Sequence, residues 1–248
     1  MHFEQLSVSK KAILMGLFLS KFDKDGLNAL GFTGFWEAFN TLAYAIAVKP
    51  ATIKNYRDEF DPYFPNLRRG WHGRPMKGYC QPVFDEFSTL CFGDFTDLIK
   101  RIAVTDYLPQ ESQIELTSHS ESVAKRLITG RSAEEYFRLN YQTVPCFSDH
   151  DIKDTTLMGC GYDFEVNRNG LRQFSVEVKG LAKTSGSIML TEKEFYVAGL
   201  LKEQYCLFIV SNFDKKPQHK YHFNPLHSQL NFKRGERQVT QVTYSATV

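Results

Sequence analysis

The chain lacks the marks of several protein classes. Its 248 residues contain no run of about eighteen apolar residues, so a membrane-spanning helix is not expected. The N-terminal segment 1–26 has one short apolar stretch without a small-residue cleavage site, which favours a cytoplasmic protein over a secreted one. No glycine-rich phosphate loop is present, so the sequence gives no reason to invoke ATP.

Metal-ligating and disulfide patterns are also missing. The seven histidines show no ligand spacing, and the five cysteines form no CxxC motif. An odd number of scattered cysteines fits reduced, mostly buried thiols better than a disulfide framework or a zinc site. The cysteines are Cys80, Cys91, Cys146, Cys160 and Cys206.

Net charge is small as well, at +2, but it is unevenly distributed. Segment 49–77 holds seven basic and three acidic residues, and segment 212–237 holds six basic and two acidic residues, so each carries a net charge of +4. Local basic stretches of this kind are compatible with nucleic-acid binding, although a solvated surface also produces them.

The N-terminal half has helical spacing of its apolar residues. Segments 10–22 and 34–48 predict two helices, and a short helix over 51–60 follows the break at Lys49-Pro50. This outline resembles a helix-turn-helix unit, although simple helical packing would produce the same outline. The residues that we expect to contact DNA here and in the following loop are Lys49, Thr52, Lys54, Asn55, Arg57, Arg68, Arg69 and Arg74.

The chain then changes character. The polar stretch 109–122 is the best candidate linker, which divides the chain into a helical DNA-recognition domain, 1–115, and a second domain, 120–248. The second domain predicts an α/β (α+β) fold in which a mixed sheet is flanked by helices. The elements expected in it are a helix over 132–144, strands near 161–167, 172–179 and 187–190, a helix over 191–203, a strand over 205–213, and strands near 220 and 239–246.

One predicted hairpin, GCGYDFEVNRNGLRQFSVEVKG at 159–180, carries charged residues on both strands. Alternation puts Glu177 and Lys179 on one face of the second strand, and Asp163 faces the same way only in one register. A two-residue turn alone pairs residue 163 with 176 and separates the carboxylates. A three-residue turn or a β-bulge pairs 163 with 177 and brings them together, and we predict one of these two.

Converging carboxylates repel each other unless a cation lies between them. Mg²⁺ takes oxygen ligands and can hold a phosphate as well. A lysine that reaches the same space can orient the attacking water and stabilise charge on the phosphate. The arrangement Asp163, Glu177 and Lys179 therefore favours hydrolysis of a phosphodiester bond.

These motifs resemble a known group of nucleases. GYD at 161–163, EVKG at 177–180, LTEKEFYVAGL from 190 and YCLFIVSNF from 205 look like the ordered motifs of the PD-(D/E)xK, or restriction endonuclease-like, superfamily. They are most similar to its Mrr-like branch, which includes the C-terminal domain named after the plant protein NO VEIN. The resemblance covers about 130–215, and Tyr162 stands where many superfamily members have proline.

The resemblance implies a Mg²⁺-dependent DNA endonuclease, with Mn²⁺ as a substitute, that leaves 5′-phosphate and 3′-hydroxyl ends. Asp163, Glu177 and the Val178 carbonyl would bind the metal, and Lys179 would assist the water. A restriction or phage-defence role follows from the same resemblance. Because small nucleases that cut both strands commonly dimerise so that two sites face two strands, we expect a homodimer on double-stranded DNA. Lys183 and Thr184, in the loop after EVKG, are further candidates for phosphate contacts.

Many relatives add a glutamate from the preceding helix, and here Glu134 and Glu135 are the candidates. With Ser132 as the N-cap, Glu135 would complete a capping box, which leaves Glu134 as the fourth catalytic residue. Alternatively, both glutamates only favour the helix dipole. Two other functions remain open: a catalytically silent DNA-binding regulator or sensor on a nuclease scaffold, and a nuclease that acts on RNA or single strands.

Overall fold

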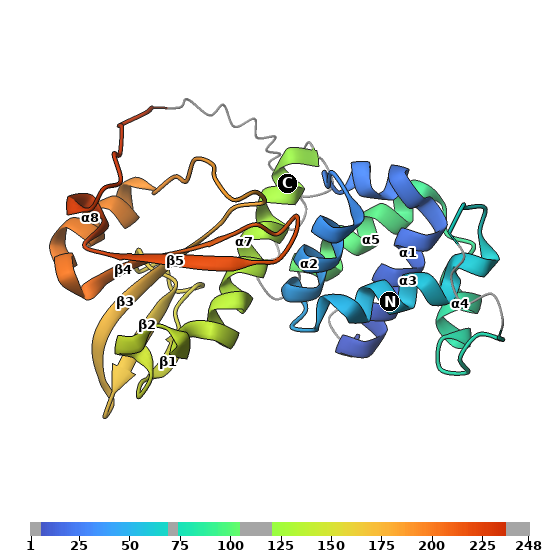
Figure 1. Ribbon diagram of the computed structural model, residues 1–248, viewed down its shortest axis with the longest axis horizontal. Helices are drawn as coiled ribbons and strands as arrows, with labels where there is room; N and C mark the ends of the chain where they lie inside the picture. Colours follow the sequence, from blue (N-terminus) through green and yellow to red (C-terminus); the bar gives the residue numbers. More distant parts are fainter. Residues whose placement is uncertain (1–5, 69–73, 105–120, 237–248) are drawn as a thin grey trace, which may run out of the picture.

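The computed structural model describes residues 6–68, 74–104 and 121–236 (Figure 1). In the N-terminal part, five helices pack around one hydrophobic core. They are α1 (Val8–Ala29), α2 (Phe35–Ala45), α3 (Pro50–Phe60), α4 (Gln81–Phe87) and α5 (Phe92–Val104). None of the described helices is both long and apolar enough to cross a bilayer.

Helix α1 lies at the centre of this core. Its N-terminus is capped by Ser7, whose side chain accepts a hydrogen bond from the Lys10 amide at 3.2 Å. Helix α3 crosses α1 at Gly16, where an added Cβ would lie 2.4 Å from the Cβ of Tyr56. Only glycine permits this close approach of the two helices. The order of helices expected over this part of the chain is confirmed.

Helix α7 (Glu121–Asn140) joins the two parts of the protein. Ile128 packs in the N-terminal core, whereas Ala133 and Phe137 pack against the sheet. The helix begins eleven residues before the predicted start at 132. The expected linker, 109–122, lies almost wholly outside the described residues.

Because α7 is continuous, the predicted capping box is wrong. Ser132 lies inside the helix, and its hydroxyl oxygen lies 2.6 Å from each of two possible acceptors, the carbonyl oxygens of Ile128 and Thr41. The contact with Thr41 ties α7 to α2. Glu135 instead lies 3.4 Å from the Arg138 guanidinium and is largely buried.

The C-terminal part contains a five-stranded mixed sheet, as the fold prediction required. Strands run in the order β1 (Asp151–Asp154), β2 (Phe164–Arg168), β3 (Leu171–Gly180), β4 (Tyr205–Ser211) and β5 (Gln218–Phe223). Only the β3–β4 pair is parallel, and helix α8 (Glu192–Leu201) makes the crossover between them. Strand β1 was not expected, the predicted strand at 187–190 does not form, and 239–246 lies outside the described residues.

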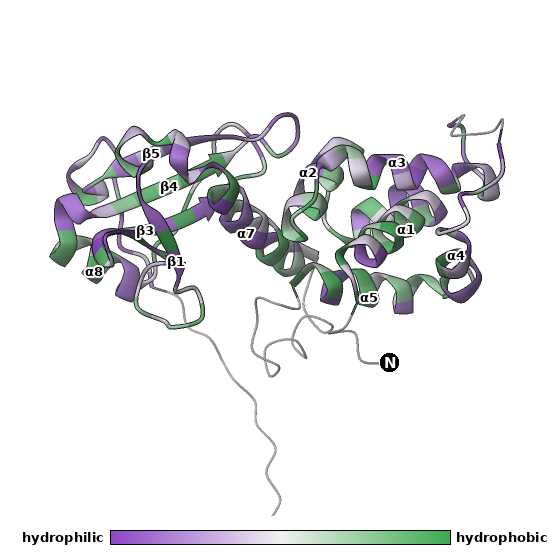
Figure 2. Ribbon diagram, turned by 90° about the horizontal axis from the view of Figure 1, so that it is seen from below, coloured by the Kyte–Doolittle hydropathy of each residue, from purple (hydrophilic) through white to green (hydrophobic). Residues whose placement is uncertain are grey.

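Two helices cover the two faces of this sheet. Helix α7 packs on the face formed by Val176, Val178 and Phe208, and the apolar strand β4 lies between β3 and β5 (Figure 2). Helix α8 packs through Ala198 on the other face, against Tyr205. Strand β3 extends beyond the start of β2, so its last residues, 177–180, pair with β4 alone in the described ladder. This open edge between α7 and α8 is where the charged residues gather.

Candidate active site

The register of the β2–β3 hairpin settles whether the carboxylates converge. Asn169 and Gly170 form a two-residue turn, with φ values of 53° and 75°. This turn pairs Arg168 with Leu171, which by itself would send the carboxylates to opposite faces. However, the register shifts between Val166 and Asn167, and Gln173 is the extra residue of a β-bulge. The predicted bulge is therefore confirmed, whereas the alternative three-residue turn does not occur.

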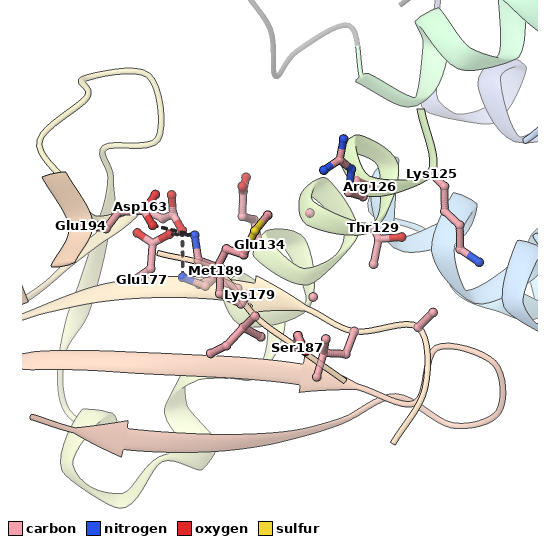
Figure 3. Close-up of a pocket in the computed structure, with 16 residues that line it drawn as sticks. Lys125, Arg126, Thr129, Glu134, Asp163, Glu177, Lys179, Ser187, Met189 and Glu194 are labelled. Atoms are coloured by element: carbon pink, nitrogen blue, oxygen red, sulfur yellow. Dashed lines mark hydrogen bonds and ion pairs between the residues drawn. The ribbon is translucent and has the colours of Figure 1, made fainter. Parts of the chain in front are cut away.

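As a result, Asp163 lies beside residues 176–178 of β3. Its amide donates to the Val176 carbonyl oxygen at 2.9 Å, and its Oδ2 accepts from the Val178 amide at 2.8 Å. The second bond fixes the orientation of the carboxylate. Figure 3 shows the side chains of Asp163 and Glu177 directed toward the same space.

The two residues before Asp163 explain the Gly-Tyr-Asp motif locally. Gly161 has a φ of 89°, and an added Cβ would lie 2.9 Å from the Val197 side chain of α8. Its carbonyl oxygen accepts from the buried Tyr205 hydroxyl at 3.1 Å. Tyr162 packs in the small cluster beside α8. These contacts of Gly161 and Tyr162 thus hold Asp163 in position.

Lys179 bridges carboxylates from two elements. Its Nζ lies 2.6 Å from Glu177 Oε1 on its own strand and 2.9 Å from Glu194 Oε2 on α8. Glu194 also caps its helix, because its carboxylate accepts from the Thr191 amide at 2.9 Å and its amide donates to the Thr191 hydroxyl at 3.2 Å. The helix expected over 191–203 is confirmed, but Glu194 was not among the residues predicted for the site.

Burial and charge perturb the titration of all three central groups. Burial raises the pKa of Asp163 to about 6. Burial and the nearby Asp163 raise the pKa of Glu177 well above its usual value. Burial alone would lower the pKa of Lys179, but the carboxylates of Glu177 and Glu194 outweigh it and raise that pKa. The Lys179 ammonium is therefore held in its charged form. The positive charge near Asp163 and Glu177 does not offset their burial, so both carboxyl groups ionise less easily than they would in water.

These groups line one end of a hollow of about 450 Å³. Glu134, which is 2% exposed, reaches it from α7, whereas Glu135 is not among its lining residues. Glu134 thus takes the position that the sequence argument gave it, although the capping argument behind that choice was wrong. Val178 also lines the hollow.

The donor set fits a hard divalent cation. No group of three or more His, Cys, Asp and Glu side chains suited to a metal ion occurs within 6–68, 74–104 and 121–236. The hollow offers instead the Asp163 and Glu177 carboxylates beside the Val178 main chain. Mg²⁺ is commonly bound by one or two carboxylates, substrate phosphate and water, so two protein carboxylates suffice. Their raised pKa values indicate the lack of positive charge that such a cation would supply.

The basic residues expected to contact DNA in the N-terminal part are mostly engaged within the protein. Arg57, only 8% exposed, lies 2.5 Å from Asp58 and packs over the rings of Phe35 and Phe39. Because Arg57 is buried, it does not form part of the expected DNA-binding surface. Further ion pairs join Lys54 to Asp58, Arg68 to Asp61 and Asp23, and Arg74 to Glu59.

The other candidates are more accessible. Lys49 and Asn55 are exposed and Thr52 is half-buried; Lys49 and Thr52 lie at the start of α3 and Asn55 in its middle. Lys183 and Thr184 are exposed in the loop after β3, where the Lys183 carbonyl oxygen accepts from the Asn212 amide at 3.0 Å. Arg69, together with Trp71, lies outside the described residues.

Comparison with known proteins gives one family. Residues 131–222 match the family model described as Protein NO VEIN, C-terminal. The matched segment runs from the second half of α7 to β5 and contains Glu134, Asp163, Glu177, Lys179 and Glu194. This match is consistent with the NO VEIN branch of the resemblance over that segment. No curated protein and no solved structure matches the chain.

Proposed function

We propose that the protein is a Mg²⁺-dependent endonuclease that hydrolyses phosphodiester bonds in double-stranded DNA. The observation that carries this proposal is the convergence of Asp163, Glu177 and Lys179 at the end of β3, which the bulge at Gln173 makes possible. The family match over 131–222 supports it. A silent scaffold would be expected to lack one of these three side chains, and all three are present.

The residues of the site have separable tasks. Asp163, Glu177 and the Val178 carbonyl would hold Mg²⁺, and Mn²⁺ would substitute. When bound, the ion would polarise the scissile phosphate and lower the pKa of the attacking water. The Lys179 ammonium, held in its charged form, donates a hydrogen bond to the phosphate oxygens as negative charge develops on them. In this charged form, paired with Glu177 and Glu194, Lys179 acts as a hydrogen-bond donor.

Two acidic side chains support this centre. Glu194 holds the Lys179 ammonium from the side of α8, at 2.9 Å. Glu134 adds a carboxylate from α7 at the opposite wall of the hollow. We assign both as positioning residues. The products expected are 5′-phosphate and 3′-hydroxyl ends, and the biological role expected is restriction or phage defence.

Cleavage assays with purified protein test the proposal. Plasmid, linear duplex, single-stranded DNA and RNA are incubated with Mg²⁺, Mn²⁺ or EDTA, and modified and unmodified phage DNA are compared. We expect metal-dependent cleavage of duplex DNA, and a loss of about 100-fold or more in Asp163→Ala and Lys179→Ala. Glu165→Gln is the matched control, because Glu165 lies on β2, two residues after Asp163, and does not line the hollow.

Other outcomes of these assays favour other functions or contradict the assigned site. Cleavage that survives Asp163→Ala or Lys179→Ala contradicts the assigned site. Cleavage of RNA or single strands alone favours that class of nuclease, and tight duplex binding without cleavage favours a regulator or sensor. The homodimer expected on duplex DNA is tested by light scattering with and without DNA.

A further inference from the structure

The hollow continues from the carboxylates along one side of α7. Arg126, Thr129, Gly130 and Glu134 all line it, and their spacing of three, four and eight residues puts them on one helical face. Ser187, in the segment between β3 and α8, lines it from the opposite wall. Figure 3 shows Glu134 beside the strand carboxylates, and Arg126 and Thr129 farther from them on the same helix.

The two ends of this channel differ in charge. Glu134 and the strand carboxylates occupy one end, and the exposed Arg126 occupies the other. At about 1.5 Å rise per residue, the eight residues from Arg126 to Glu134 span about 12 Å along the helix axis. Lys125 lies beside Arg126, but its Nζ lies 2.6 Å from Glu37 Oε1 of α2 and is held there. Arg126 is therefore the cation of this channel that faces solvent.

The floor of the channel is a glycine that packing does not require. A Cβ added at Gly130 would meet nothing within 4 Å, although glycine is disfavoured inside a helix. Gly180 provides the contrast, because a Cβ there would lie 2.8 Å from the Thr129 carbonyl oxygen, so β3 could not approach α7 with a larger residue. Gly130 thus keeps the middle of the channel free of side chain at a position where the fold would accept one.

We propose that this channel binds the backbone of the DNA strand being cut, with Arg126 contacting a phosphate a few nucleotides from the scissile one. The inference rests on the proposed function and adds the path of the substrate. Phosphates of one strand are spaced by at least the axial rise of about 3.4 Å per nucleotide, so a group about 12 Å from Glu134 would contact a phosphate other than the scissile one. Arginine suits this contact because its planar guanidinium binds phosphate oxygens in pairs.

Equilibrium binding tests the channel independently of cleavage. Each variant is made in the Asp163→Asn background, and binding to a fluorescein-labelled duplex is measured by anisotropy over a range of salt concentrations. Arg126→Ala should weaken binding about tenfold and reduce the slope of log K against log salt by about 0.9. Arg126→Lys should restore much of the affinity. The control is Arg168→Ala, at the exposed tip of the β2–β3 hairpin, which should bind unchanged.

A second pair of variants tests the floor. Gly130→Phe should reduce duplex binding because its ring occupies the channel, whereas Gly130→Ala should bind almost as well as its parent. Unchanged affinity and salt slope in Arg126→Ala would overturn the inference, as would failure of the parent to bind duplex DNA. If the wild-type chain cleaves DNA and Arg126→Ala binds normally, the channel is wrong and the proposed function stands. If binding depends on Arg126 but the wild-type chain cleaves no nucleic acid, the channel stands and the proposed catalysis fails.

Discussion

The ionised carboxylate of Asp163 should destabilise the fold, so neutralising it should stabilise the protein while abolishing cleavage. Burial raises the pKa of Asp163 from 3.8 to about 6. One pKa unit corresponds to about 1.4 kcal/mol, so the ionised group costs at most about 3 kcal/mol of folding free energy at about pH 8. Asp163→Asn keeps an oxygen for the Val178 amide and removes this cost.

The expected gain depends on pH in a definite sense. Above pH 6 the folded wild-type carboxylate is ionised and the full cost applies, whereas below about pH 4 the group is protonated in both states and the cost vanishes. For a chain of this size we expect the Tm of Asp163→Asn to exceed that of wild type by up to about 10 °C near pH 8. The difference should disappear near pH 4.

Thermal unfolding in EDTA, followed by circular dichroism at several pH values, measures this difference. Glu165→Gln serves as the control, since Glu165 forms a surface ion pair with Lys153 at 3.2 Å and should change Tm little. A Tm of Asp163→Asn that is lower than wild type near pH 8, or a difference that stays constant from pH 8 to pH 4, would refute the electrostatic reasoning.

Three further tests, made with substitutions and one deletion, probe the geometry. Lys179→Met leaves the buried Glu177 without its ammonium and should cost about 3 kcal/mol in urea unfolding near neutral pH, with a smaller loss as Glu177 takes up a proton in acid. Gly180→Ala places a methyl group 2.8 Å from a main-chain oxygen of α7 and should cost about 1–3 kcal/mol, whereas Gly130→Ala, which meets nothing within 4 Å, should cost nothing. Deletion of Gln173 removes the bulge, so it should abolish cleavage while the circular dichroism spectrum stays unchanged. Gln173→Ala should retain both cleavage and the bulge. A deletion variant that still cleaves DNA would contradict the assigned strand register.

The sequence predicted the sheet and its site because local patterns carry most of that information. Alternation along 172–179 places Glu177 and Lys179 on one face, and the Asn169-Gly170 turn fixes where the hairpin reverses. The bulge at Gln173 has no distinct sequence signal. It followed only from the requirement that the carboxylates meet, so two geometries remained open.

The remaining differences arise from tertiary contacts. Ser132 has the composition of an N-cap, but its hydroxyl bonds to the Thr41 carbonyl oxygen of α2, and α7 continues through it. The Thr191-x-x-Glu194 pattern is typical of a helix start, which is correct, but it does not indicate that the same carboxylate reaches Lys179 from α8. The basic residues of α3 were also assigned from sequence alone. The sequence gives the number of charged residues, but it does not show which of them form ion pairs within the fold, as Arg57 does.

Counting the metal ions that the chain binds tests the central claim most directly. Titration with Mn²⁺, followed by electron paramagnetic resonance of the free ion, gives the number of bound ions and their affinity without any need for cleavage. We expect tight binding by the wild-type chain and by Glu165→Gln, and at least a tenfold weakening in Asp163→Asn and in Glu177→Gln. Equal Mn²⁺ binding by wild type and Asp163→Asn would show that the two strand carboxylates do not form a metal site.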